Sequence, residues 1–272
     1  MTESAHGTRV FIELGPRPEE PTQLVRPGAR SSYPADVLAR LDGDAETIIA
    51  RYRDDSAGQA SITSRSALLP LLHLVQSEDG YITPAGIDFC SGKLGLTGAE
   101  VAAVSTFYSM YRRGPTGEYL VGVCTNTLCA IMGGDAILEA LEEHLGSAGT
   151  RDDASHSLST SDGKITLEHV ECNAACDYAP VVMVNWEFFD NQTPESARSL
   201  VDALRSGERV TPSRGATLCS FRETARTLAG FEDSRVEASE AETCGDATLA
   251  GLRVAHRQEP TATDSSTPGE GK

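Results

Sequence analysis

Two stretches, Cys124-Thr125-Asn126-Thr127-Leu128-Cys129 and Cys172-Asn173-Ala174-Ala175-Cys176, place four cysteines in two pairs. Four residues separate the members of the first pair, three separate those of the second, and 42 lie between the pairs. Each pair adjoins a segment with the composition of a β-strand, so the thiols belong to two loops. Four thiolates are the complete ligand set of one [2Fe–2S] cluster. The sequence therefore predicts that Cys124, Cys129, Cys172 and Cys176 hold such a cluster and that the protein transfers electrons.

The same four cysteines are also compatible with a structural zinc site made of four thiolates. Zinc sites most often have two residues between paired cysteines, whereas spacers of four and three residues give the wider cradle that two irons need. A thioredoxin-type dithiol catalyst requires Cys-x-x-Cys at the start of a helix, and neither pair has this spacing. A zinc-stapled interaction module and a thiol oxidoreductase stay open as alternatives.

The segments around the cysteines predict an α/β domain over residues 114–207. One strand, a crossover helix, a second strand, a hairpin and a closing helix form a thioredoxin-like domain with a mixed sheet. Cys124 and Cys172 each end a strand, so both pairs should lie at one edge of the sheet. The helix after Gly133-Gly134 is expected to direct the free amides of its first turn at the cluster. The expected elements are strands at 119–123, 165–170, 181–186 and 188–189, helices at 135–145 and 194–207, and an exposed loop at 147–163.

The preceding residues 35–113 predict a small helical bundle. Apolar residues recur at helical spacing near 37–49 and 68–75. Thr83 before Pro84 marks one helix start, and Thr97 with Glu100 forms a capping box for a helix reaching Met110. The flanking parts are an irregular N-terminal arm at 1–34, which holds five of the thirteen prolines, and an extension at 208–272 with one helix at 221–229 and a disordered polar end.

Composition excludes several classes of partner. The chain has 272 residues and a formal charge of −17, which repels phosphate backbones and anionic lipids. Its longest mostly apolar run, Ala67 to Val75, is too short to cross a bilayer, and no signal sequence precedes it. Nucleic acid binding and direct membrane insertion are therefore not expected, and the protein is predicted to be cytoplasmic.

Other residues of metal-binding or redox type are expected to pack or to stay free. Cys90 falls on a predicted helix as a small hydrophobe. His73 and His169 are not needed as ligands, because four cysteines already saturate a cluster. Trp186 is expected to pack on a strand. The two cysteines of the extension have no further Cys or His cluster beside them and are expected to be free thiols: Cys219 and Cys244.

The two cysteine motifs, read together with their flanks, closely resemble those of the E subunit of bacterial NADH-quinone oxidoreductase, respiratory complex I. The motif around the second pair continues through Asp177-Tyr178-Ala179-Pro180-Val181. The stretches Asp79-Gly80-Tyr81-Ile82, Val104-Ser105-Thr106-Phe107-Tyr108 and Pro194-Glu195 also agree, in the right order. The resemblance covers about Pro34 to Gly207. Asn173-Ala174-Ala175 departs from it, because similar chains usually have a Leu-Gly-Ala-type run there.

The resemblance implies a thioredoxin-like [2Fe–2S] ferredoxin domain that works as an electron-transfer subunit of this oxidoreductase. It implies docking against the FMN- and NADH-binding F subunit and the large iron–sulfur G subunit, peripherally on the cytosolic side of the membrane. This chain carries neither the Gly-x-Gly-x-x-Gly nor the Gly-x4-Gly-Lys-Ser/Thr phosphate motif, so FMN and NADH are expected on the partner. The diaphorase module of an NAD-linked hydrogenase or formate dehydrogenase is the alternative of the same chemistry. The extension after Gly207 is expected to contact the flavin-binding partner or a neighbour.

Overall fold

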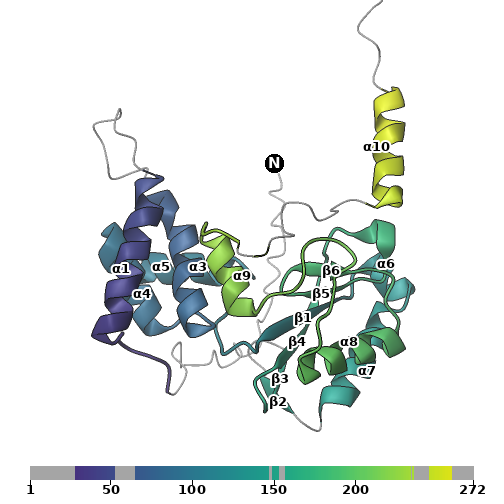
Figure 1. Ribbon diagram of the computed structural model, residues 1–272, viewed down its shortest axis with the longest axis horizontal. Helices are drawn as coiled ribbons and strands as arrows, with labels where there is room; N and C mark the ends of the chain where they lie inside the picture. The colour runs from purple at the N-terminus through teal and green to yellow at the C-terminus, as the bar shows by residue number, and fades with distance from the viewer. Residues whose placement is uncertain are drawn as a thin grey trace, which may run out of the picture.

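The computed structural model describes residues 28–52, 65–146, 149–152, 157–233, 235 and 245–258. Helices gather on one side of the molecule, and a sheet with its covering helices forms the other side (Figure 1). Each side has its own apolar core: one core is formed by the first helices, the other by the sheet and the two helices packed on it. The predicted N-terminal arm lies outside the described residues, apart from its last seven.

The first side is the predicted helical bundle. Thr83 caps its third helix by accepting a hydrogen bond from the amide of Gly86, and Thr97 and Glu100 form the predicted capping box of the fourth. That fourth helix ends at Phe107, earlier than the predicted Met110, because Tyr108 takes an extended conformation. The helices are α1 (Ala35–Ala50), the short 3₁₀ turn η1 (Arg65–Ala67), α3 (Leu68–Asp79), α4 (Pro84–Leu94) and α5 (Gly98–Phe107).

The second side is a six-stranded mixed sheet with the strand order β2-β3-β4-β1-β5-β6. The central strands β1 (Tyr119–Cys124) and β4 (Ile165–Val170) run parallel, and every other neighbouring pair is antiparallel. A right-handed crossover is the expected connection between parallel neighbours, and α7 (Gly134–Gly146) lies on this connection. The remaining elements are β5 (Val182–Val184), β6 (Glu187–Phe189) and α8 (Pro194–Ser206), which begins at the predicted Thr193 cap.

The predicted exposed loop at 147–163 is wrong for its described residues. They form an antiparallel hairpin of β2 (Gly149–Asp152) and β3 (Ser157–Thr160), which extends the sheet beyond β4. Hydroxyl side chains gave the segment its loop-like composition, but they serve the sheet here. The side chain of Thr160 accepts a hydrogen bond of 3.0 Å from the amide of Ile165, and Leu158 is buried in the core. Polar composition therefore misled the prediction at an edge hairpin.

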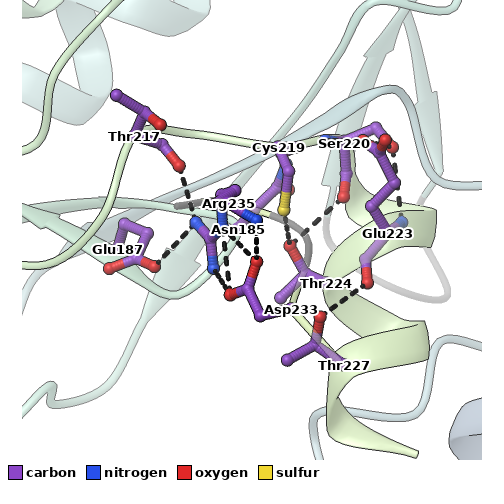
Figure 2. A network of polar contacts seen from close by, with 10 residues as sticks. All are labelled: Asn185, Glu187, Thr217, Cys219, Ser220, Glu223, Thr224, Thr227, Asp233 and Arg235. Atoms are coloured by element: carbon purple, nitrogen blue, oxygen red, sulfur yellow. Dashed lines mark hydrogen bonds and ion pairs between the residues drawn. The ribbon is translucent and has the colours of Figure 1, made fainter. Parts of the chain in front are cut away.

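The C-terminal segment after α8 returns across both sides of the molecule. Its helix α9 (Phe221–Leu228), which was predicted, packs on α3, and its fully buried Phe221 also stacks on Trp186 of the sheet at 5.4 Å. Figure 2 shows Asn185, at the turn between β5 and β6, donating a hydrogen bond of 2.8 Å to the carbonyl of Cys219. Arg235 donates to the carbonyl of Thr217 at 2.6 Å (Figure 2). This segment therefore binds the bundle to the sheet within one chain.

A last helix, α10 (Asp246–Gln258), lies in the polar end of the extension, where the sequence predicted no helix. It stands apart from both cores (Figure 1). Its first turn contacts the short 3₁₀ turn η2 (Cys176–Tyr178), which follows β4 in the chain. Among the described residues, no helix has the length and apolar content needed to cross a membrane.

Candidate metal centre

The two central strands bring both cysteine pairs to one edge of the sheet, as predicted. Cys124 is the last residue of β1 and lies opposite Val170, the last residue of β4. Because the strands are parallel, the loops that follow them leave the sheet at the same edge. The amide of Thr125 donates a hydrogen bond of 3.1 Å to the carbonyl of Val170, which holds the two loops together.

Cys129 lies on a short helix, α6 (Thr127–Ile131), that the sequence analysis missed. The helix predicted to start beside the cysteine loop, α7, begins only after it, so α6 and not α7 carries the ligand. The start of α7 still packs closely on the first pair. A Cβ atom at Gly134 would lie 2.4 Å from the carbonyl oxygen of Cys124 and 2.9 Å from that of Cys129. Only glycine permits this approach, which fixes the backbone of both residues.

The first pair is enclosed. Cys124 and Cys129 are 2% and 3% exposed and form a small buried cluster with Ala179. Burial raises the pKa of the Cys129 thiol to about 11, and the neighbouring thiols of Cys124 and Cys176 add to the rise. The fold therefore buries the thiols of the first pair next to each other. Because metal ligation requires thiolates, loading this site must release protons.

The second pair lies in an open loop. Cys172 and Cys176 are both exposed. Between them Ala174 has φ of 52°, a left-handed conformation that L-residues other than glycine, asparagine and aspartate rarely adopt. This conformation directs its amide at the sulfur of Cys172, at 3.3 Å. An amide donor to a ligand sulfur stabilises a negatively charged cluster.

Aromatic and basic side chains also contact the loop of the second pair. The carbonyl of Tyr178, in η2, accepts a hydrogen bond of 2.9 Å from the amide of Asn191. The guanidinium of Arg214 lies over the ring of Tyr178 at 5.4 Å and forms an ion pair of 2.7 Å with Asp190. Arg214 belongs to the C-terminal segment, so this segment reaches the predicted metal site.

The donor set, four thiols, fits a [2Fe–2S] cluster, and a zinc site can be made of the same four. All four predicted ligands are thiols, and a [2Fe–2S] cluster takes two of them at each iron. A tetrahedral zinc site needs all four around one ion. Throughout the described ranges, no three His, Cys, Asp or Glu side chains converge so as to hold one metal ion.

The other predicted residues lie away from this edge or outside the description. Cys90 is fully buried in the bundle core, as predicted, and burial raises its pKa to about 12. His73 is also buried and stacks on Tyr111 at 4.8 Å, and burial lowers its pKa to about 4. The Cys219 thiol contacts the hydroxyl of Thr224 at 3.2 Å. Cys244 lies outside the described residues.

Trp186 differs from the prediction made for it. Trp186 belongs to a turn with φ of 69° and packs on Phe221, so it is not a strand residue. His169, by contrast, ends up close to the first pair: its Nδ1 lies 3.5 Å from the hydroxyl of Thr125. The sequence analysis missed Asn185 and Arg214 altogether. The signal for Asn185 was its place before Trp186 between two short apolar runs, since asparagine favours the left-handed positions of hairpin turns.

The parallel central strands of the mixed sheet place two thiol pairs at one edge. This arrangement defines a small domain of the redox and metal-binding class. The family model of the thioredoxin-like [2Fe–2S] ferredoxins matches residues 45–205, and the chain belongs to this family. This result confirms the predicted fold class and the predicted family.

Relatives of known name agree with the family. The E subunit of NADH-quinone oxidoreductase from Mycobacterium tuberculosis (strain H37Rv) is 62% identical over 263 residues, 97% of this chain and 97% of the relative. The protein of the same name from Rickettsia bellii is 34% identical over 163 residues, 60% of this chain and 89% of the relative.

Solved structures align less completely. An NAD⁺-reducing [NiFe]-hydrogenase covers 52% of this chain and 23% of its own, with 19% identity and a TM-score of 0.44. A thioredoxin-like [2Fe–2S] ferredoxin from Aquifex aeolicus covers 36% of this chain and 93% of its own, with 21% identity and a TM-score of 0.27. At these scores neither structure supports an argument about this chain.

Proposed function

We infer that this chain is an electron-transfer subunit of an NADH-quinone oxidoreductase and that Cys124, Cys129, Cys172 and Cys176 hold its [2Fe–2S] cluster. One observation carries the ligand assignment: parallel strands β1 and β4 deliver the two thiol pairs to the same edge, where Cys129 is buried beside Cys124 and the Cys124 sulfur lies 4.0 Å from the carbonyl of Glu171, the residue before Cys172. Membership of the [2Fe–2S] ferredoxin family supports the choice of metal.

The residues of this chain bind and orient the cluster, and the bound cluster supplies one-electron chemistry. The buried first pair excludes water from its side of the site. The amide of Ala174 supplies a fixed dipole at the sulfur of Cys172. The exposed second pair leaves one side of the site open to a partner, as an electron carrier requires.

The partner in this proposal is the NADH-binding F subunit, whose FMN accepts a hydride and passes electrons on one at a time, with the large iron–sulfur G subunit as a second neighbour. The names of the mycobacterial and rickettsial relatives support an assembly of this kind. A peripheral position on the cytosolic side of the membrane belongs to the same proposal.

Metal and sulfide analysis tests the function directly. Anaerobically purified chain should contain two irons and two acid-labile sulfides per molecule, since each [2Fe–2S] cluster holds two of each. Dithionite-reduced protein should give the electron paramagnetic resonance (EPR) signal of one such cluster. Zinc without labile sulfide would establish the interaction module in its place. Cys219→Ser is the matched control, because Cys219 is not a predicted ligand and its thiol contacts Thr224 in the C-terminal segment. It should leave the iron content unchanged.

A further inference from the structure

Exposed apolar side chains concentrate around the predicted metal centre. Of the ten large exposed apolar side chains in the described part of the chain, five belong to α6, to the residue that ends it, or to α10. Among them Ile131 is 77% exposed, Met132 56% and Leu252 53%. Exposed apolar side chains that gather on a monomer mark an interaction site. Leu252 and Val254 lie two positions apart on α10 and so face different sides of that helix. The five are Leu128, Ile131, Met132, Leu252 and Val254.

The two helices that carry these side chains are tied to the ligand loops. α6 contains Cys129, and η2 contains Cys176. α10 begins on η2: the amide of Ala247 donates a hydrogen bond of 3.1 Å to the Tyr178 hydroxyl, and the hydroxyl of Thr248 bonds to the carboxylate of Asp177. Figure 1 shows α6 and the base of α10 at the same end of the sheet. A protein that approaches the exposed thiols therefore meets both helices.

We propose that α10 and the exposed side of α6 form one docking surface around the open thiol pair, and that its occupant is the electron-exchange partner, a protein subunit with an apolar patch ringed by carboxylates. The inference rests on the proposed function, because that function supplies the need for such a partner. The surface is defined by α6, Met132, η2 and α10.

Charge selects this occupant over others. α10 carries Arg253 and Arg257, one helical turn apart and so on the same side, in a chain of formal charge −17. Two arginines at the rim of an apolar patch complement carboxylates on a partner and speed its approach. The same net charge opposes a second copy of this chain and an anionic lipid surface.

The comparisons place α10 outside the part that the whole family shares. The family match ends at residue 205, before α10 begins. The alignment with the Mycobacterium tuberculosis protein covers 97% of this chain, and a match of that extent includes α10. The docking helix is thus an addition to the shared ferredoxin domain. Chains that lack it must bind their partner through other contacts.

Binding to one purified partner tests the surface. The full-length chain, with its cluster, is titrated with the NADH-binding subunit of the same host's oxidoreductase by biolayer interferometry. Leu252→Asp and the double variant Arg253→Glu/Arg257→Glu should each weaken binding at least tenfold. Leu38→Asp is the matched control, because Leu38 is 40% exposed on α1, in the bundle, and it should bind within twofold of the unaltered chain. Added salt should weaken binding of the unaltered chain more than that of the arginine variant.

The possible outcomes separate this inference from the proposed function. The substituted residues follow the first turn of α10, where its contacts lie, so all variants should keep their iron content and EPR signal. Normal binding by both α10 variants overturns the docking surface alone, whereas no binding by the unaltered chain also overturns the partner named in the proposed function. Self-association in sedimentation that the α10 variants abolish overturns it too, in favour of a second copy. Absence of iron and sulfide in the unaltered chain overturns the proposed function instead.

Discussion

The first cysteine pair is enclosed by regular structure, whereas the second pair lies in an open loop. Cys124 ends a central strand, Cys129 lies on a helix, and Gly134 lets the next helix press on both. Cys172 and Cys176 flank a residue in a left-handed conformation, and Cys176 belongs to no more than the short turn η2. The fold therefore builds one half of the site in advance, and we expect the bound cluster to complete the other half.

Ligand replacement should show the largest difference between the pairs. We predict that Cys124→Ser and Cys129→Ser abolish the cluster, because a hydroxyl is a poor ligand for iron and the buried site admits no other donor. Cys172→Ser and Cys176→Ser should retain part of the iron with an altered EPR signal, because these positions are exposed and water could replace the lost thiolate there. Iron content and EPR of the four anaerobically reconstituted proteins check this. Equal losses at all four positions would contradict the difference in construction.

Thiol labelling of the metal-free chain should separate the same pairs by rate. Iodoacetamide at pH 8 should modify the exposed Cys172 and Cys176 first and the buried Cys124 and Cys129 much later. Cys90 should have the lowest labelling rate. With a pKa near 12, roughly one Cys90 thiol in ten thousand is ionised at pH 8, and burial blocks access as well.

The pH dependence of labelling follows from the direction of the shifts. Burial raises the pKa of Cys129 to about 11, so its thiolate fraction and labelling rate should rise about tenfold between pH 8 and pH 9. Mass spectrometry of the digested protein resolves each cysteine. Rapid modification of Cys129 before Cys172 would show that the first pair is not preformed.

The side chain of Asn185 forms a clamp of three hydrogen bonds beside β1, the strand that ends at Cys124. The Asn185 side chain accepts a hydrogen bond from the amide of Leu120 and donates to the carbonyls of Glu118 and Cys219. Asn185→Ala leaves the Leu120 amide and the Cys219 carbonyl without this partner, whereas the Glu118 carbonyl still accepts from the amide of Phe221, and we predict a loss of about 3 kcal/mol in the free energy of unfolding. Urea denaturation of the full chain measures it.

Asn191→Ala isolates the hydrogen bonds from backbone strain. Asn191 has φ of 49°, close to the 48° of Asn185, and it is exposed. Both variants therefore carry the same cost for alanine in a left-handed conformation, about 1–2 kcal/mol at most. If the two variants unfold at the same urea concentration, the clamp does not stabilise the strand.

Helices that begin at a side-chain cap were predictable, whereas a hairpin held by cross-strand contacts and a very short helix were not. Helices with a threonine cap, at Thr83, Thr97 and Thr193, start where predicted because the cap is a local interaction. The hairpin of β2 and β3 escaped prediction because its hydroxyl groups are satisfied by β4, which lies later in the chain. α6 escaped because five residues are too short for a periodic signal.

The same reasoning applies to the site. The spacing of the cysteines predicted the four thiols and their common edge, because parallel strands end together. Which pair is buried could not be predicted, since the burial of Cys129 depends on Gly134 and Ala179. Arg214 supports the second loop through its contact with Tyr178. The two residues are 36 positions apart, so no local sequence pattern could predict this contact.

The smallest expected effect concerns the second loop and its departure from similar chains. Ala174 has φ of 52°, a conformation that glycine adopts without strain. Ala174→Gly removes a left-handed strain of about 1–2 kcal/mol and adds about 0.4–1 kcal/mol of unfolded-state entropy, so we predict a net gain of about 0.5–1 kcal/mol in the metal-free chain. The neighbouring Ala175→Gly is the matched control: with φ of −115° and a buried side chain it has no strain to lose and should be destabilised. Calorimetric unfolding of the two variants with and without the cluster measures both terms. A gain in stability confined to the metal-free chain would mean that the bound cluster holds the loop in its left-handed turn. The second pair would then depend on the cluster for its conformation, whereas the first pair does not. Destabilisation of both variants alike would mean that the open loop is as rigidly specified as the enclosed pair.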